Sequence, residues 1–237
     1  MHKNKVALVT GANKGIGLAI ASQLAARGIT VLVGARDLAR GEVAAKQITG
    51  DARALELDVT RADSIAAAAT RIRRELGRLD VLINNAGIAR GAKPSSTKLD
   101  DVRAVFETNV FGVIAVTQAM LPLLLEAPAG RIVNVSSRLG SLSAITDPAF
   151  PMPGVGGVAY GPSKTALNAV TIAFAQELAS TRIKVNLACP GHTATDLNGH
   201  SGQRTVTEAA REPVRLALLG PEGSTGTFTN DDGGIAW

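Results

Sequence analysis

The sequence predicts an α/β protein: one doubly wound domain spanning residues 1–237, with helices on both faces of a mainly parallel sheet of about seven strands. Short apolar runs alternate with longer segments of helical period, and no linker or change of composition interrupts this alternation. Hydrophobic residues make up 46% of the chain and charged residues 19%, which allows a substantial core. Since aromatic residues are only 3%, that core must be aliphatic.

The strands are predicted where the apolar runs are short. In chain order they cover residues 6–9, 31–33, 54–57, 81–83, 132–135, 183–188 and 225–229. The helices are predicted where apolar residues recur with helical period. They cover residues 15–26, 38–48, 62–76, 99–125, 160–178 and 208–219. Doubly wound sheets bind ligands outside the carboxyl ends of their strands, so the loops after the strands should carry the chemistry.

A glycine-rich turn joins the first predicted strand to the first helix. It reads Thr10-Gly11-Ala12-Asn13-Lys14-Gly15-Ile16-Gly17. Glycines in this place let the backbone turn tightly and approach a pyrophosphate, which the helix N-terminus stabilises. The spacing G-x-x-x-G-x-G differs from G-x-G-x-x-G, but the position between strand and helix is the one that identifies a dinucleotide site. The turn therefore predicts a Rossmann-type fold with cofactor contacts from Gly11, Asn13, Lys14, Gly15, Ile16 and Gly17.

The residues after the second predicted strand indicate which dinucleotide binds. Arg36 follows that strand, and an arginine there accommodates the 2′-phosphate of NADP. Lys14, in the glycine turn, can bring a second positive charge to the same phosphate. Asp37 could instead bind ribose hydroxyls, as in NAD enzymes, but its position suits the N-cap of the helix that begins near Leu38. We therefore predict NADP(H) as the cofactor.

The only tyrosine of the chain, Tyr160, stands four residues before Lys164. At this spacing the two side chains share one face of a helix. A nearby ammonium favours the phenolate and lowers a tyrosine pKa below its usual value of about 10, which makes a proton donor usable near neutral pH. Pairs with this spacing are common on any helix, so the interpretation depends on the rest of the chain.

Five segments resemble, in the same order, the signatures of the short-chain dehydrogenases/reductases. They are Thr10 to Gly17, Leu57-Asp58-Val59, Asn84-Asn85-Ala86-Gly87, Tyr160 to Lys164, and Pro190-Gly191 with Thr195. The resemblance covers almost the whole chain. Within the family the chain looks most like the NADPH-dependent carbonyl reductases, through segments that include Ala35-Arg36-Asp37 and Cys189-Pro190-Gly191.

The resemblance implies a role for each matching residue. Tyr160 would be the general acid and base, Lys164 would lower its pKa and hold the nicotinamide ribose, and Ser137 would bind the substrate oxygen. Asn109 would fix a water linked to Lys164. The resemblance implies further cofactor contacts from Asp58, Val59, Asn85, Ala86, Gly87, Pro190, Gly191, Thr193 and Thr195, with Asn85 also bracing the sheet.

Some of these residues have structural alternatives. Ser136 could take the role of Ser137, or both serines could merely cap a turn. Asn109 could instead bond the backbone of a neighbouring segment, and Asp58 could be the N-cap of the next helix. Cys189 follows an apolar strand, which favours a buried small side chain over a nucleophile.

The catalytic and cofactor residues together predict an NADP(H)-dependent oxidoreductase that interconverts a small ketone or aldehyde and its alcohol. Reduction of a C=C or imine bond is an alternative, and a non-catalytic nucleotide sensor is a weaker one. The net charge of +5 comes without a dense basic run, which argues against nucleic acid as a partner. The three histidines are too scattered for a metal site.

Other features bear on location and assembly. One cysteine excludes an internal disulfide, and with no signal peptide or apolar stretch of membrane-spanning length we expect a cytoplasmic protein. The Pro- and Gly-rich segment before Tyr160 is longer than is usual in the family and should cover a site or an interface. It leaves the substrate range open, and also the choice between a monomer and a homo-dimer or tetramer. The short polar loop at 192–207 suggests an open pocket.

Overall fold

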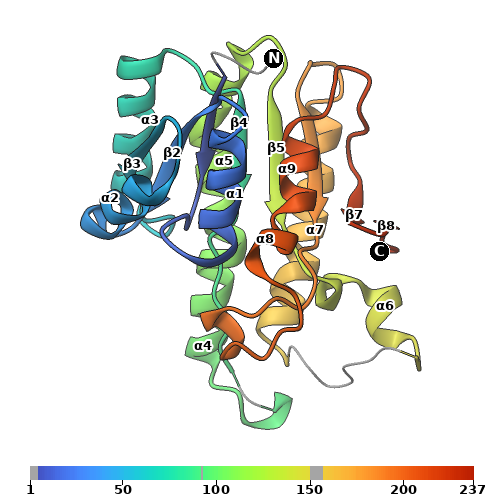
Figure 1. The fold of residues 1–237 in the computed structure, drawn as a ribbon. Helices are drawn as coiled ribbons and strands as arrows, with labels where there is room; N and C mark the ends of the chain where they lie inside the picture. Colours follow the sequence, from blue (N-terminus) through green and yellow to red (C-terminus); the bar gives the residue numbers. More distant parts are fainter. Residues whose placement is uncertain (1–4, 92, 150–156) are drawn as a thin grey trace.

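The computed structural model describes residues 5–91, 93–149 and 157–237, and its strands form one sheet in the order β3-β2-β1-β4-β5-β6-β7-β8 (Figure 1). The strands are β1 (Val6–Val9), β2 (Thr30–Ala35), β3 (Ala52–Glu56), β4 (Val81–Asn84), β5 (Arg131–Val135), β6 (Lys184–Ala188), β7 (Phe228–Asn230) and β8 (Gly233–Gly234). Every neighbouring pair is parallel except β7 and β8. The predicted doubly wound, mainly parallel sheet is confirmed. The additional strand, β8, consists of two glycines, which carry no hydropathy pattern.

The helices connect the strands and cover both faces of the sheet. They are α1 (Gly15–Ala25), α2 (Leu38–Gln47), α3 (Ala62–Leu76), α4 (Leu99–Phe106), α5 (Gly112–Leu125), α6 (Leu142–Thr146), α7 (Tyr160–Glu177), α8 (Val206–Ala209) and α9 (Arg211–Ala217). The predicted helix at 99–125 contains a π-helical turn, Glu107–Phe111, between α4 and α5. The predicted helix at 208–219 is divided into α8 and α9.

The long segment before Tyr160 contains a short helix, α6, which its composition did not indicate. A 3-10 turn, Arg138–Gly140, precedes that helix. The most proline-rich part of the segment, residues 150–156, lies outside the described residues.

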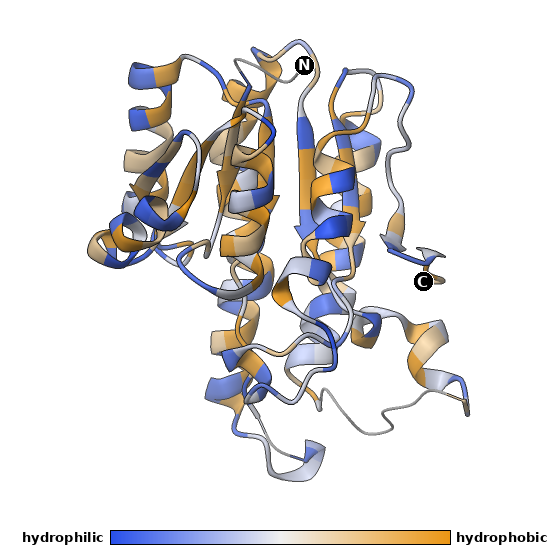
Figure 2. Cartoon of the chain, in the orientation of Figure 1, coloured by the Kyte–Doolittle hydropathy of each residue, from blue (hydrophilic) through white to orange (hydrophobic). Residues whose placement is uncertain are grey.

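The core has two layers, one on each face of the sheet, as the alternation of side chains along a strand requires. Ala7 and Val9 of β1 face the layer formed with α1 and α9, whereas Leu8 faces the layer formed with α3 and α5. Side chains such as Leu24 and Met120 are completely buried, and both layers are almost wholly aliphatic. In Figure 2 the hydrophobic residues run through the central strands and helix α1. The expectation of an aliphatic core is confirmed.

The helical stretch Leu99–Leu125 is long and apolar enough to cross a membrane by length and composition, and half of its most apolar window is buried. The packed helix of a protein core passes the same test. Here Met120 and Leu123 of this stretch pack with residues of α3 and the sheet, so the feature only weakly supports a membrane span.

The order of the strands reverses between β1 and β4. These two strands lie side by side with Val9 opposite Ile83, and the Thr10 amide donates to the Ile83 carbonyl at 3.0 Å. The carboxyl ends of β1 and β4 therefore meet at the place where a doubly wound sheet opens a crevice for a ligand.

Candidate active site

Asn85 ties together the ends of the two strands that meet at this crevice. Its side-chain Nδ2 donates to the Thr10 carbonyl at 2.9 Å and to the Gly11 carbonyl at 3.2 Å. The main-chain amides of Asn85 and Ala86 both donate to Thr10 Oγ1, at 3.0 and 2.9 Å. Gly11 has a φ of +61°, and a Cβ there would lie 3.0 Å from Ala86 Cα. The glycine turn and the segment after β4 are therefore fastened together, and Asn85 has the bracing contacts expected of it.

The start of α1 is shaped to receive an anion. Gly15 has a φ of +59°, and the nearest atom to a Cβ placed there is Thr195 Cγ2 at 3.9 Å, so space is open in front of the helix. Gly17 lies on the packed side, where a Cβ would come within 2.5 Å of the Gly11 carbonyl oxygen. Lys14, at the N-cap, makes no side-chain capping hydrogen bond, and the first turn carries no acidic residue. Exposed helix N–H groups and open backbone suit a pyrophosphate. The predicted contacts Asn13 and Ile16 flank Lys14 and Gly15 in this turn.

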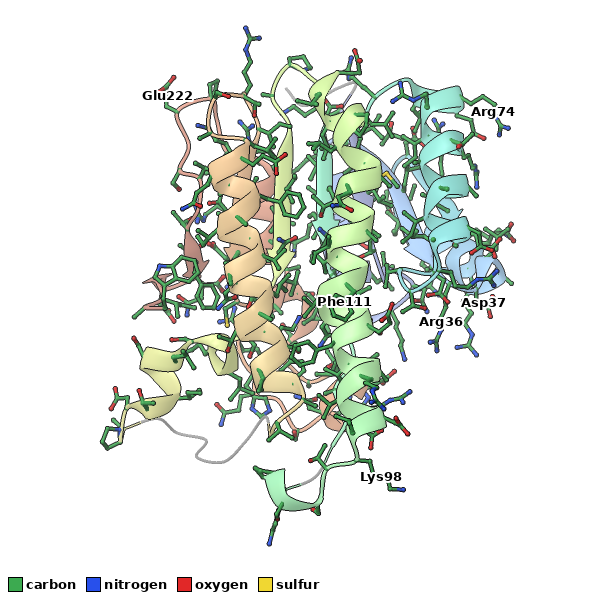
Figure 3. The ribbon with its side chains drawn as sticks, turned by 180° about the vertical axis from the view of Figure 1, so that it is seen from behind. Arg36, Asp37, Arg74, Lys98, Phe111 and Glu222 are labelled. Carbon is green, nitrogen blue, oxygen red and sulfur yellow. The ribbon has the colours of Figure 1, made fainter. Side chains whose placement is uncertain are left out.

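The charged residues expected to select the cofactor lie at the same edge. Arg36 and Asp37 follow β2 and lie at the surface, as Figure 3 shows. Asp37 Oδ1 accepts from the Arg40 amide at 3.1 Å, so Asp37 is the N-cap of α2, as expected. Lys14 forms an ion pair with Asp196, a contact that no sequence pattern indicated. Both partners are largely exposed, and such pairs contribute only about 0–1 kcal/mol, so a phosphate can replace the carboxylate.

Asp58 occupies the loop after β3 and does not cap the next helix. Its Oδ1 accepts from the Thr60 amide at 3.0 Å and the Thr60 hydroxyl at 2.7 Å, whereas the N-cap of α3 is Arg61. Burial acts to raise the pKa of Asp58, but the bonds from Thr60 and the positive charges of Arg36 and Arg61 outweigh it and hold the pKa below its usual value. The carboxylate therefore stays ionised beside Arg36. The neighbouring Val59 packs against the start of α5.

Asn109 is completely buried in the π-helical turn. Its Oδ1 accepts from the Ile88 amide at 2.9 Å, and its Nδ2 donates to the Ile88 carbonyl at 2.9 Å and to Ser163 Oγ at 3.0 Å. Both amide hydrogens are thus used within the protein, so the side chain bonds a neighbouring backbone, as the structural alternative predicted. A Cβ on Gly87 would lie 3.3 Å from Asn109 Oδ1 and 3.7 Å from Lys164 Nζ, which places Asn109 close to the lysine. Its role toward a water stays a prediction.

Tyr160 and Lys164 lie on the first two turns of α7. Lys164 Nζ is 5.7 Å from the centre of the Tyr160 ring and donates to the Val135 carbonyl at 2.8 Å. The lysine is 5% exposed. The tyrosine as a whole keeps some exposed surface, but its phenol hydroxyl is enclosed by the protein. Among the described residues Val135 is the one acceptor found for the three N–H groups of Lys164. The remaining N–H groups of Lys164 can therefore donate to the hydroxyls of a ligand.

The expected direction of the tyrosine pKa shift is wrong for the protein alone. Burial raises the pKa of Tyr160 to about 12, and the nearby Cys189 adds to the rise, while the hydrogen bond with Ser137 opposes it. Burial also lowers the pKa of Lys164 to about 8. Removing both groups from water favours their neutral forms, and this outweighs the attraction that the spacing predicts.

This shift can be measured directly because Tyr160 is the only tyrosine. We expect the ultraviolet absorbance change of the phenolate to have its midpoint near pH 12 in the cofactor-free protein, rather than near 10. Circular dichroism should show that the chain is still folded across the transition, and Tyr160→Phe should abolish the signal. A midpoint near 10 in folded protein would show that burial does not control this group.

Ser136 and Ser137, the two serines after β5, have different surroundings. Ser136 is buried, and its hydroxyl donates to Asn168 Oδ1 at 2.6 Å. Ser137 Oγ accepts from the Leu139 amide at 3.2 Å and is hydrogen-bonded to Tyr160. The structure therefore brings Ser137 to the tyrosine, whereas Ser136 is a tie between β5 and α7.

Cys189 lies close to Tyr160 and Lys164. The thiol is buried and accepts from the main chain of Gly191 and Arg138, and burial raises its pKa. This confirms the prediction of a buried small side chain. Its closeness to Tyr160 and Lys164, whose pKa values it affects, was not foreseen because these residues are far apart in the sequence.

The loop after β6 faces the glycine turn. Gly191 has a φ of +74°, which favours glycine, and the buried Thr193 donates its hydroxyl to the carbonyls of Pro190 and Gly191, both at 3.2 Å. Thr195 lies across from Gly15. The loop after β6 and the glycine turn thus lie next to each other at the carboxyl end of the sheet. Within residues 5–91, 93–149 and 157–237, no group of three His, Cys, Asp or Glu is placed to hold a metal.

Comparison with known proteins bears on this arrangement. A family model described as short chain dehydrogenase matches residues 5–205. Carbonyl reductase (NADPH) 1 of Homo sapiens is 35% identical over 95% of this chain and 96% of its own length. A short-chain dehydrogenase of Penicillium roqueforti is 38% identical over 95% of this chain and 93% of its own. (−)-Isopiperitenone reductase of Mentha piperita is 33% identical, with 98% of each chain covered.

Solved structures show the same fold. Salutaridine reductase from Papaver somniferum superposes with a TM-score of 0.84 at 29% identity, covering 96% of this chain and 99% of that one. A metagenomic short-chain oxidoreductase in complex with NADP gives a TM-score of 0.79, also at 29% identity, with 96% and 97% covered.

Proposed function

Because the chain belongs to the short-chain dehydrogenase family, we propose that it is an NADP(H)-dependent oxidoreductase that reduces a ketone or aldehyde to an alcohol, reversibly. The observation that carries this proposal is the grouping of Tyr160, Lys164 and Ser137 beside the glycine crevice. These groups can donate a proton to a carbonyl oxygen, hold that oxygen, and bind the hydroxyls of a nucleotide.

The crevice fits the proposed cofactor. Open backbone at Gly15 and the uncapped start of α1 suit the pyrophosphate, and the unused N–H groups of Lys164 suit the ribose hydroxyls. Arg36, supported by Lys14, would accept the 2′-phosphate. Relatives named as NADPH carbonyl reductases and a solved relative bound to NADP support the same choice. When bound, NADPH supplies the hydride.

The protein's own part in the reaction is to deliver a proton. With a pKa of about 12 the phenol of Tyr160 is fully protonated near neutral pH, so it can donate to a carbonyl oxygen that becomes negative. Ser137, hydrogen-bonded to the same phenol, can donate to that oxygen as well. The cation of Lys164 and the charge of an oxidised nicotinamide both favour the phenolate that remains. The reverse reaction uses this phenolate as the base.

The direct test measures NADPH consumption with a panel of ketones and aldehydes, with NADH assayed in parallel. We expect turnover with NADPH and alcohol as the product. Relatives named for other substrates, such as isopiperitenone reductase, keep reduction of a C=C or imine bond as a second candidate. A cyclic enone separates the two, because an allylic alcohol supports carbonyl reduction and a saturated ketone supports the alternative.

Replacing Arg36 with alanine should weaken NADPH binding at least tenfold and NADH binding by less than about twofold, since a charge-assisted bond to phosphate contributes about 1.5–3 kcal/mol. The dissociation constants of both cofactors would be measured by fluorescence titration. The matched control is Arg40→Ala, which removes a nearby exposed arginine paired with Asp37 and should leave the preference unchanged. Equal losses for both cofactors in Arg36→Ala would show that the assignment is wrong.

A further inference from the structure

Two hydrogen bonds join the segment Ile235–Trp237 to the loop before Tyr160. The Ser141 hydroxyl donates to the Ala236 carbonyl at 2.6 Å, and the Ser143 amide donates to the main-chain oxygen of Trp237 at 2.9 Å. Ser141 is completely buried, so its bond is shielded from water. The sequence separation of these partners exceeds 90 residues in each case, so tertiary packing alone creates the contact.

The segment Ile235–Trp237 is itself fastened to the sheet. The Ile235 amide donates to the Phe228 carbonyl of β7 at 2.8 Å. The rings of Trp237 and Phe228 lie 5.8 Å apart between centres, tilted by 34°, and Phe228 is buried. This geometry is favourable for an aromatic pair. The segment Ile235–Trp237 therefore connects the loop to strand β7 of the sheet.

The other side of the same loop touches the catalytic helix. A Cβ on Gly140 would lie 2.7 Å from the Lys164 main-chain carbon. The 3-10 turn Arg138–Gly140 therefore packs directly against α7 at Lys164. Asn168 Nδ2 donates to the Gly140 carbonyl at 3.1 Å, and Asn168 Oδ1 accepts from Ser136. The loop, which begins at Ser137, is thus held between α7 and the segment Ile235–Trp237.

We propose that the segment Ile235–Trp237 is a brace for the loop 137–146 and that Trp237 is a positioning residue for carbonyl binding. The inference rests on the proposed function, because the loop begins with the serine that would bind the substrate oxygen. The brace acts on Ser137 through the packed loop, and Trp237 does not touch the reacting atoms. Its loss should therefore affect the affinity for the carbonyl compound more than the hydride transfer or the binding of NADPH.

The kinetic test compares Trp237→Ala and Trp237→Phe with the wild type in the full chain. For Trp237→Ala we expect the KM of the carbonyl substrate to rise about three- to tenfold, the effect of losing one aromatic pair. The kcat and the KM for NADPH should change by less than about twofold. Trp237→Phe keeps a ring against Phe228 and should restore most of the carbonyl KM. An unchanged carbonyl KM in Trp237→Ala, or no rescue by phenylalanine, would overturn the proposal.

A second measurement does not depend on activity. Hydrogen exchange of the amides in 138–146 should be faster in Trp237→Ala than in the wild type, since this variant removes the ring that fastens the segment to Phe228. Ser143→Ala is the matched control, because the contact of Ser143 with Trp237 runs through the main chain. Unchanged exchange in Trp237→Ala would refute the brace even if the enzyme reduces carbonyls. Faster exchange in a protein that reduces no carbonyl would instead refute the proposed function, and with it the role of Trp237 in carbonyl binding, while the brace itself would stand.

Discussion

Replacing Tyr160 with phenylalanine should lower kcat for carbonyl reduction by about 10²–10⁴, because it removes the proton donor and leaves the ring in place. Phenylalanine keeps the packing of the tyrosine at the start of α7, so the fold and the site for NADPH should be preserved. The rate would be measured by NADPH absorbance with the best carbonyl of the panel, and NADPH affinity by fluorescence titration. Affinity should change by less than about threefold.

The control for this variant is Thr165→Ala, which removes a hydroxyl from the same helix. The Thr165 hydroxyl donates a hydrogen bond to the Gly161 carbonyl at 3.3 Å and takes no part in the proposed chemistry. We expect its kcat to stay within about twofold of the wild type. Substantial activity in Tyr160→Phe would mean that another group supplies the proton. Loss of NADPH binding in that variant would point to a structural role for the phenol.

The regular elements of this fold follow directly from local patterns. The limits predicted for β1 and α3 agree with Val6–Val9 and Ala62–Leu76. A strand ends where its apolar run ends, and a helix ends where the helical period of its apolar residues ends. The elements that were missed have no such pattern. The helix α6 is five residues long, and the π-helical turn at Glu107–Phe111 lies within a continuous helical period.

The site could be predicted as a set of residues but not as a set of interactions. The spacing of Tyr160 and Lys164 placed them on one helix face, but the direction of their pKa shifts depends on burial by segments distant in sequence. The ion pair between Lys14 and Asp196 joins residues 182 positions apart. Both serines follow the same strand, and the structure distinguishes them because Ser136 bonds Asn168 whereas Ser137 bonds Tyr160.

Replacing Lys164 with methionine should reduce kcat at least about 10²-fold, because the phenolate loses the cation that stabilises it. Unlike Tyr160→Phe, this variant should also bind NADPH more weakly, since the N–H groups free for the ribose hydroxyls are lost. The two variants therefore separate proton delivery from cofactor binding. Retention of full NADPH affinity in Lys164→Met would show that the lysine does not hold the nucleotide.

The same variant tests the burial of the lysine through the pH dependence of stability. The pKa of Lys164 is lowered from 10.5 to about 8 by burial. Between these values the unfolded chain holds a proton that the folded chain has released, so the free energy of unfolding gains a contribution that rises with pH. Below pH 8 the folded protein holds a buried ammonium, and this gain is absent. At about 1.4 kcal/mol per pKa unit, the contribution is roughly 3 kcal/mol at most.

Urea unfolding at pH 7 and at pH 9.5, which is below the usual tyrosine pKa of about 10, would measure this contribution. We expect the wild type to gain stability over this interval relative to Lys164→Met, which has no charge to bury and should be at least as stable at pH 7. Lys46→Met, which changes an exposed lysine on α2, should follow the wild type. If Lys164→Met also follows the wild type, the lysine is not desolvated in the folded protein.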